Sequence, residues 1–334
     1  MITYIIKRIL QIIPILIAIS IISFIVIELP PGDFLTSKIA QLTKEGGTVS
    51  ETELNNLRVS YGLDKPVVQR YFIWIWKIIS RGDFGRSFKW NKPVFEVIGE
   101  RLMLTVIISI TTLIFVWVVA IPIGVLSATR QYSIFDYGAT FIGFIGLAVP
   151  NFLLALILMF ISYKYFGVTI TGLFSQEYAD SAWNFGKFLD MMKHIWVPVV
   201  VIGTSGTAGI IRTLRGCLLD ELKKQYVVTA RAKGLSERKI LFKYPVRIAL
   251  NPLISTIGWV LPGIISGDAI VANVLNLPTT GTVLLESLQF QDMYLAASFV
   301  LLLSFLTVIG TLISDILLAL TDPRIRYERN EKNV

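Results

Sequence analysis

Tyr226-Val-Val-Thr-Ala-Arg-Ala-Lys-Gly-Leu235 is a basic, polar stretch that lies between two long apolar runs. It belongs to the window Arg212–Arg247, which holds ten Lys and Arg residues against three Asp and Glu residues. Positive charge beside apolar runs marks the cytoplasmic side of a membrane protein. Because Ala and long side chains favour helix, the stretch predicts a helical cytoplasmic loop between two membrane spans.

Two turn signals divide this loop. Gly234 suits the end of a helix, since glycine readily adopts the left-handed conformation found there. Ser236 is a good N-cap for a second helix. A short helix, a glycine turn and a second helix would make a compact knob that fits a cleft of a soluble partner. The alternative is a solvated basic loop beside anionic lipid.

The composition is that of an integral membrane protein. Hydrophobic residues make up 54% of the chain and charged residues 16%, with a mean hydropathy of +0.67. Ordinary soluble domains carry roughly 25% charged residues. The net charge of +8 would suit nucleic acid, but the excess lies in loops and tails beside apolar runs, as membrane topology requires. We therefore expect a lipid membrane as the surroundings and no nucleic acid partner.

Six apolar stretches predict an all-α, polytopic membrane protein with six transmembrane helices, because about 20 apolar residues cross a bilayer. The first stretch is too long for a secretory signal, so we expect it to be retained. Pro150 lies inside the third stretch and predicts a kink or break near Gly146. The six predicted spans are Ile9–Ile27, Leu102–Thr129, Tyr137–Tyr163, Ile195–Ile211, Ile248–Gly267 and Met293–Ser314.

The distribution of Lys and Arg predicts that both termini are cytoplasmic. Basic residues lie at the inner ends of the predicted spans, whereas the segment Asn273–Asp292 contains none. The chain then divides into a first transmembrane helix (1–29), an extracytoplasmic helical segment (30–101), a transmembrane core with the cytoplasmic loop 212–247 (102–320), and a cytoplasmic tail (321–334).

The long outer segment carries helix signals of its own. Ser50-Glu-Thr-Glu53 is a capping box, and Asp64-Lys-Pro66 opens a second, aromatic helix that Gly82 closes. The aromatic side chains either pack on the membrane interface and the outer ends of the spans, or form a docking surface for another protein.

Asp268 is the main charged residue in the otherwise nearly uncharged spans. If the fifth helix begins at Ile248, Asp268 lies about 30 Å along it, at the outer interface. If the helix begins after Pro252, Asp268 lies deeper and could line a polar pathway. Small residues in the fourth span predict either close helix packing or a moving interface: Gly203, Gly206 and Gly209.

The sequence excludes several kinds of site. It has no G-x-x-x-x-G-K-[ST] loop and no H-E-x-x-H motif, and intramembrane catalysis would need polar groups inside the spans. The single Cys217 and the single His194 cannot supply a multi-cysteine or typical zinc site. We therefore expect no catalytic residue, metal or cofactor. A channel would show a filter or a pore-lining ring, and none is found.

The segment Thr229-Ala-Arg-Ala-Lys-Gly-Leu235 resembles the "EAA" coupling loop of ABC importer permeases, in the form typical of the oligopeptide/dipeptide/nickel family. Further matches follow in order along nearly the whole chain. They include Pro31-Gly-Asp33, Gly82-Asp-Phe-Gly85 with Ser87, Asp136, Pro150, Arg247 and Asp322-Pro-Arg324.

This resemblance implies a type I ABC importer permease fold in a prokaryotic inner membrane. The implied partners are a second homologous permease subunit, two ATP-binding subunits that hydrolyse ATP, and an extracytoplasmic substrate-binding protein. The chain itself would not be an enzyme. The residues implied to couple it to the ATPase are Tyr226, Thr229, Ala230, Arg231, Ala232, Lys233, Gly234 and Leu235.

The chain departs from the family pattern at three places, of which the last two lie on or near regions that could affect gating or the solute. It has Val228-Thr-Ala230 where the coupling loop usually begins with Glu-Ala-Ala, and Tyr244-Pro245 where the family usually has His-Ala. It has Ala272-Asn-Val-Leu-Asn-Leu-Pro-Thr279 where relatives often read Glu-x-Val-Phe-x-x-Pro-Gly. The expected solute is a peptide or an oligosaccharide. The alternatives are a nickel or metal-chelate permease of the same family and, less favoured, a non-ABC channel.

Overall fold

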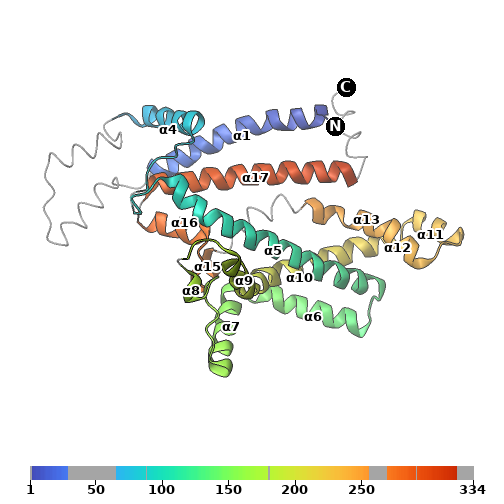
Figure 1. Cartoon of the computed structure of the whole chain (residues 1–334). Coiled ribbons are helices and arrows are strands. Elements are labelled where there is room, and N and C mark those ends of the chain that lie inside the picture. The colour runs from blue at the N-terminus through green and yellow to red at the C-terminus, as the bar shows by residue number, and fades with distance from the viewer. Residues whose placement is uncertain are drawn as a thin grey trace. The chain divides into compact units, whose positions relative to one another are not determined.

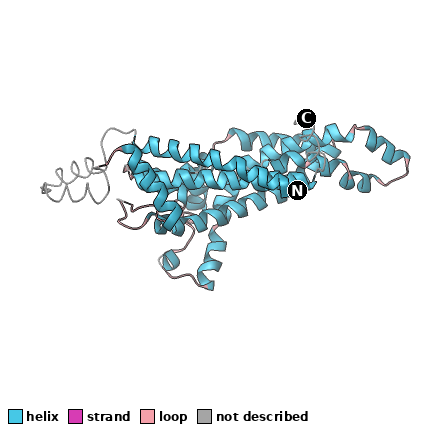
Figure 2. Ribbon diagram, turned by 90° about the horizontal axis from the view of Figure 1, so that it is seen from above, coloured by secondary structure: helices cyan, strands magenta, loops and turns pink. Residues whose placement is uncertain are grey.

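The computed structural model describes residues 2–28, 65–87, 89–179, 181–255, 269–290 and 292–321. All regular structure in these ranges is helical, which confirms the predicted all-α class (Figure 2). The elements are α1 (Ile2–Glu28), α4 (Val67–Arg81), α5 (Val94–Thr129), α6 (Ile134–Ala148), α7 (Asn151–Phe166), α8 (Gln176–Ala179), α9 (Phe185–His194), α10 (Trp196–Leu222), α11 (Gln225–Ala232), α12 (Glu237–Lys243), α13 (Pro245–Ala249), α15 (Ala269–Val274), α16 (Thr280–Gln289) and α17 (Met293–Thr321).

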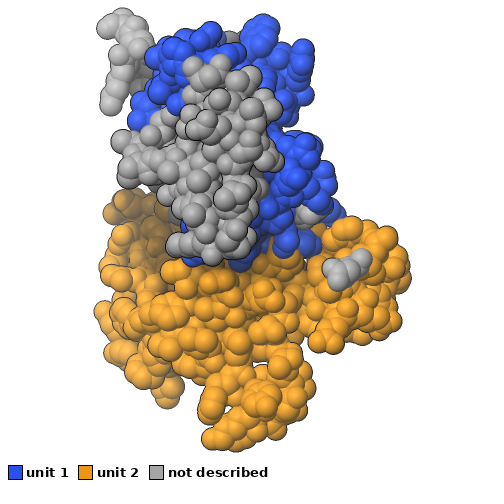
Figure 3. Space-filling model, turned by 90° about the vertical axis from the view of Figure 1, so that its left-hand side faces the viewer, with its two compact units in different colours: residues 1–105, 279–306 blue, residues 106–278, 307–334 orange. Residues whose placement is uncertain are grey.

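The chain forms two compact units. Unit 1 contains residues 1–105 and 279–306, and unit 2 contains residues 106–278 and 307–334 (Figure 3). Unit 2 contains the basic loop 212–247.

Three helices in the described ranges are long and apolar enough to cross a membrane: Val94–Thr129, Trp196–Leu222 and Tyr294–Leu317. A shorter apolar helix, Leu10–Ile25, lies inside α1. The helices α1, α5, α10 and α17 match the first, second, fourth and sixth predicted spans, except that α10 begins one residue after Ile195. The helices α5 and α10 are longer than the second and fourth predicted spans, because α5 begins at Val94 and α10 continues to Leu222. The predicted loop 212–247 therefore starts as a continuation of α10.

The third predicted span, Tyr137–Tyr163, is not one continuous helix. α6 ends at Ala148, α7 begins at Asn151, and the two helices are bent by 99° (Figure 1). Val149 has extended backbone angles, as expected for a residue that precedes a proline. The break that Pro150 predicts is present, but it lies at Val149 instead of Gly146.

Several predicted features lie outside the described residues. They are the capping box Ser50–Glu53, the greater part of the fifth predicted span, Asp268, and the tail that contains Asp322–Arg324. The aromatic helix predicted after Pro66 is present as α4, and Gly82 ends it with a φ of 65°.

Unit 1 is held by aromatic packing between α1 and α4. The ring of Phe24 meets Tyr71 edge-on at 5.5 Å and lies 5.8 Å from the ring of Trp74. The hydroxyl of Tyr71 also forms a 2.8 Å hydrogen bond with Ser20. The inner face of α4 therefore packs within the molecule, whereas Phe72 and Trp76 remain exposed.

Unit 2 is built on close contacts of α10 with α5 and α6. A Cβ on Gly203 would lie 2.8 Å from Phe115, and one on Gly146 would lie 3.1 Å from Thr204. These contacts confirm close packing for Gly203. A Cβ on Gly209 would have no atom within 4 Å. The glycines of α10 therefore do not all pack closely against a neighbouring helix.

Candidate functional site

The loop after α10 folds as the predicted helix–turn–helix, which we call the knob (α11 and α12). α11 ends in a Schellman motif. The Leu235 N–H donates to the Ala230 carbonyl at 3.3 Å, and the Gly234 N–H donates to the Arg231 carbonyl at 2.9 Å. Gly234 has a φ of 74°, a conformation that costs glycine little. Ser236 occupies the N-cap of α12, but its side chain makes no capping hydrogen bond.

The knob has a small hydrophobic core of its own. Val227, Ala230 and Ile240 are buried, with Tyr226, Leu235 and Tyr244 packed around them. Ala230 is only 6% exposed, so its methyl group faces this core. A substitution at Ala230 would thus act first on the fold of the knob.

A hydrogen bond fastens the knob to the end of α10. The Tyr226 hydroxyl donates to the Glu221 carboxylate at 2.5 Å. Burial, together with this carboxylate, raises the pKa of the Tyr226 hydroxyl. Tyr226 therefore stays a neutral donor at physiological pH.

The remaining predicted site residues form the exposed outside of the knob: Thr229, Arg231, Ala232, Lys233 and Gly234. Arg231 binds Glu237 through two hydrogen bonds, of 2.6 and 3.1 Å, and so joins α11 to α12 across the turn. The hydrogen bond from Arg231 also lowers the pKa of the Glu237 carboxyl. Because both side chains are exposed, the pair contributes little to stability.

Two apolar side chains on the knob's surface were missed by sequence reasoning. Val228 is 50% exposed and Phe242 is 56% exposed. The sequence signal that could have identified each of them is an apolar residue on the otherwise polar face of a short basic helix. Single exposed apolar side chains are common on protein surfaces, so these two only add apolar area to the basic surface of the knob.

The knob is mounted on a packed base. Leu214 and Leu218 of α10 pack with Val125 of α5 and Val246 of α13, and Leu241 of α12 lies against the same cluster. Gly124 allows α5 to approach, since its would-be Cβ lies 3.1 Å from Leu214. The knob therefore stands on the same packed cluster as α10 and α5.

Comparison with known families identifies the chain. The model described as "binding-protein-dependent transport system inner membrane component" matches residues 120–327, more than half of the sequence. The chain belongs to this family. The model for the N-terminal part of such membrane components matches residues 1–111. These matches confirm the resemblance to ABC importer permeases, and the knob lies within the first of them.

Relatives that match this permease over nearly its whole length are named for oligopeptide, dipeptide and peptidoglycan transport systems. The oligopeptide transport system permease protein AppB of Bacillus subtilis is 37% identical over 328 residues, which is 98% of this chain and 100% of that protein. The dipeptide transport system permease protein DppB of Escherichia coli K12 is 30% identical, with the same coverage of both chains. The peptidoglycan transport system permease protein YejB of Agrobacterium fabrum is 30% identical over 98% of this chain and 99% of that protein.

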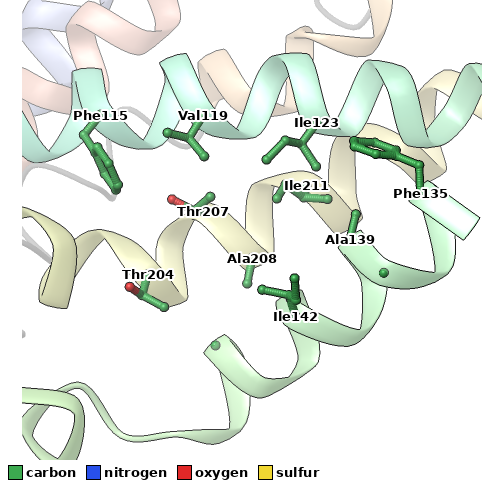
Figure 4. Close-up of a pocket in the computed structure, with 13 residues that line it drawn as sticks. Phe115, Val119, Ile123, Phe135, Ala139, Ile142, Thr204, Thr207, Ala208 and Ile211 are labelled. Atoms are coloured by element: carbon green, nitrogen blue, oxygen red, sulfur yellow. The ribbon is translucent and has the colours of Figure 1, made fainter. Parts of the chain in front are cut away.

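A cavity of about 460 Å³ lies between α5, α6 and α10 of the permease (Figure 4). Phe115 and Ile123 of α5 face Ile142 of α6 across it, and its polar groups are the hydroxyls of Thr204 and Thr207. Thr204 donates to the Val200 carbonyl at 2.6 Å. The cavity thus offers an apolar surface without a charged side chain.

The predicted pathway residue Asp268 lies outside the described ranges, so its surroundings stay a matter of prediction. Within the described ranges, no group of three or more His, Cys, Asp or Glu residues is arranged to hold a metal ion.

Proposed function

We propose that this permease forms, with a second homologous permease subunit, the pathway through which an ABC importer moves peptides. An extracytoplasmic binding protein delivers the peptide, and two separate ATP-binding subunits hydrolyse ATP. The knob supports this proposal most directly. It is a pre-folded, basic helix–turn–helix with exposed apolar side chains, and it stands on the same packed base as the spans.

In this proposal the knob is the contact with an ATPase subunit. The exposed set of Thr229, Arg231, Ala232 and Lys233 forms the contact surface together with Val228 and Phe242. Tyr226, Ala230, Gly234 and Leu235 give that surface its shape. Closure of the ATPases then moves α10 and α5 as rigid elements.

A peptide is the favoured solute among the alternatives that the sequence leaves open. Relatives named for oligopeptide and dipeptide transport match nearly all of this chain, which supports a peptide over an oligosaccharide or a metal chelate. Asp268 is proposed to line the pathway, where its charge would attract the amino group of a peptide.

The proposed topology places both termini and the knob in the cytoplasm and residues 30–101 outside. The transmembrane core then runs from 102 to 320 and the tail from 321 to 334. The Lys and Arg bias supports this orientation. The exposed aromatic side chains of α4, Phe72 and Trp76, fit a docking face for the binding protein on the outer side.

The test is uptake by the assembled importer. The permease is purified with its partner permease, the two ATPases and the binding protein, and is reconstituted in proteoliposomes. We expect ATP-dependent accumulation of labelled peptides. Accumulation of an oligosaccharide or a nickel chelate without any peptide uptake would refute the proposed solute, and uptake without ATP would refute the importer itself.

A further inference from the structure

A buried carboxylate and a guanidinium join α6 to α10. Asp136, in the first turn of α6, is 2% exposed. Its Oδ1 accepts a hydrogen bond from Nε of Arg215 at 2.7 Å, and its Oδ2 accepts one from Nη2 at 2.7 Å. Two parallel bonds of this kind fix the relative orientation of the two side chains as well as their distance.

The same carboxylate also holds the end of α5 and the turn that follows it. The Ser127 hydroxyl donates to Oδ1 of Asp136. The Tyr132 N–H donates to Oδ2 at 3.0 Å. Tyr132 has a φ of 62°, an uncommon and strained conformation for a bulky residue. One carboxylate therefore binds three helices and stabilises a strained turn between two of them.

This cluster lies on the route from the knob to the spans. Arg215 is about two helical turns before the end of α10, and α11 begins three residues after that end. The turn between α5 and α6 and the knob lie toward the same end of α10 (Figure 1).

Apolar packing alone would leave the relative position of these helices loosely defined. Contacts among Val125, Leu214 and Leu218 are non-directional, so they specify the register of the helices less sharply than hydrogen bonds do. A buried charged pair often adds little net stability, because the desolvation of both groups offsets their attraction. The directional bonds at Asp136 instead fix the register of α6 and α5 on α10.

We propose that Asp136 and Arg215 form a latch that makes α5, α6 and α10 follow the knob as one body. Both are positioning residues for the coupling of ATP hydrolysis to transport. The inference rests on the proposed function, in which the knob receives the motion of the ATPase.

The experiment compares three variants in the reconstituted importer: Asp136→Asn, Arg215→Gln and the double variant. Each single variant leaves one buried charged or polar partner unmatched, so we expect less assembled complex. We also expect about five- to tenfold more ATP hydrolysed per peptide imported. The double variant removes both charges, so assembly should recover while the ATP-to-peptide ratio stays high.

The matched control is Glu96→Gln. Glu96 is also an acidic residue in the first turn of a long helix, but it pairs with Lys92 on an exposed surface. We expect wild-type assembly and a wild-type ratio for this variant.

A double variant that recovers both assembly and the wild-type ratio would reduce the pair to a stabilising role and overturn the latch. Wild-type ratios in both single variants would overturn it as well. If neither single variant accumulates in the membrane, the ratio of ATP hydrolysed to peptide imported is measured in Ser127→Ala instead. This variant removes one hydrogen bond to Asp136 and leaves no buried charge unpaired. An unchanged ratio in that variant contradicts the latch. A wild-type importer that takes up no peptide would instead contradict the proposed function.

Discussion

The hydroxyl of Ser87 donates a 2.5 Å hydrogen bond to the buried carboxylate of Asp292, a residue 205 positions further along the chain. The Lys89 N–H donates to the same carboxylate oxygen at 3.1 Å. The backbone N–H of Leu295, in the first turn of α17, donates to the other oxygen, Oδ1, with 3.4 Å between nitrogen and oxygen. The segment after α4 is thereby fixed to the start of α17 within unit 1.

Replacement of Ser87 by Ala should destabilise unit 1. The buried carboxylate of Asp292 would lose a short hydrogen bond, at a cost of about 1–3 kcal/mol. We expect a lower melting temperature of the detergent-solubilised permease in a thermal unfolding scan. Ser80→Ala is the control, because the Ser80 hydroxyl is exposed and bonds only within its own helix. Equal melting temperatures for the two variants would contradict the assigned role of Ser87.

Gly234→Val should distort the knob without unfolding the spans. A Cβ on Gly234 would meet no atom within 4 Å, so the cost is the backbone strain of a β-branched residue at positive φ, about 1–2 kcal/mol. We expect normal insertion and pairing with the partner permease, but loss of ATPase retention or of coupled transport. Subunit retention and substrate-stimulated ATPase activity measure this. Gly216→Ala, at an unobstructed helical position of α10, should behave as wild type.

Substitutions at Ala230 and Ala232 test the fold of the knob and its contact surface separately. Ala230→Asp places a charge in the core formed with Val227 and Ile240, so the isolated permease should become sensitive to proteolysis at the knob. Ala232 is exposed, so Ala232→Asp should leave that resistance unchanged and weaken only ATPase association. Limited proteolysis and a pull-down with the ATPase distinguish the two effects. Equal protease sensitivity of the two variants would show that the small core does not hold the knob together.

The sequence predicted the knob because its signals are local. Gly234 and Ser236 mark a turn within a few residues of the helices that they separate, and both occupy the predicted positions. Pro150 likewise predicted a break, although a proline does not determine an angle of 99°. The orientation of Ala230 was missed, because a small apolar residue in a basic loop fits an inner or an outer face equally well.

The long-range hydrogen bonds inside each unit could not be predicted in the same way. Asp136 and Arg215 are 79 positions apart, and Ser87 and Asp292 are further apart still. Periodicity identifies which face of one helix is apolar, but it does not select a partner on a distant helix. The extension of α5 back to Val94 was missed for a related reason. Lys92, Glu96 and Arg101 give that part the composition of a loop, although Val94 and Ile98 are buried in unit 1.

The proposed topology predicts opposite labelling at two exposed positions. In a Cys217→Ser background, Gln289→Cys should react with a membrane-impermeant maleimide added to intact cells. Ser236→Cys, in the knob, should react only after the membrane is permeabilised. The assay is labelling of the purified permease from each preparation. Reaction of Ser236→Cys in intact cells would place the knob on the outer side and rule out contact with a cytoplasmic ATPase.

Gly203 and Gly209 test whether the small residues of α10 serve packing. A Cβ on Gly203 would lie 2.8 Å from the ring of Phe115 and 3.3 Å from Val116, so Gly203→Ala should force α5 away from α10 at a cost of about 1–3 kcal/mol. Gly209 has open space at the same point, and Gly209→Ala should be neutral or slightly stabilising, because alanine favours helix by about 1 kcal/mol over glycine. The melting temperature should therefore fall in the Gly203→Ala variant and not in the Gly209→Ala variant. A fall of similar size in both would mean that α10 is packed along its whole glycine series in the assembled membrane protein, and that the open space at Gly209 is filled there.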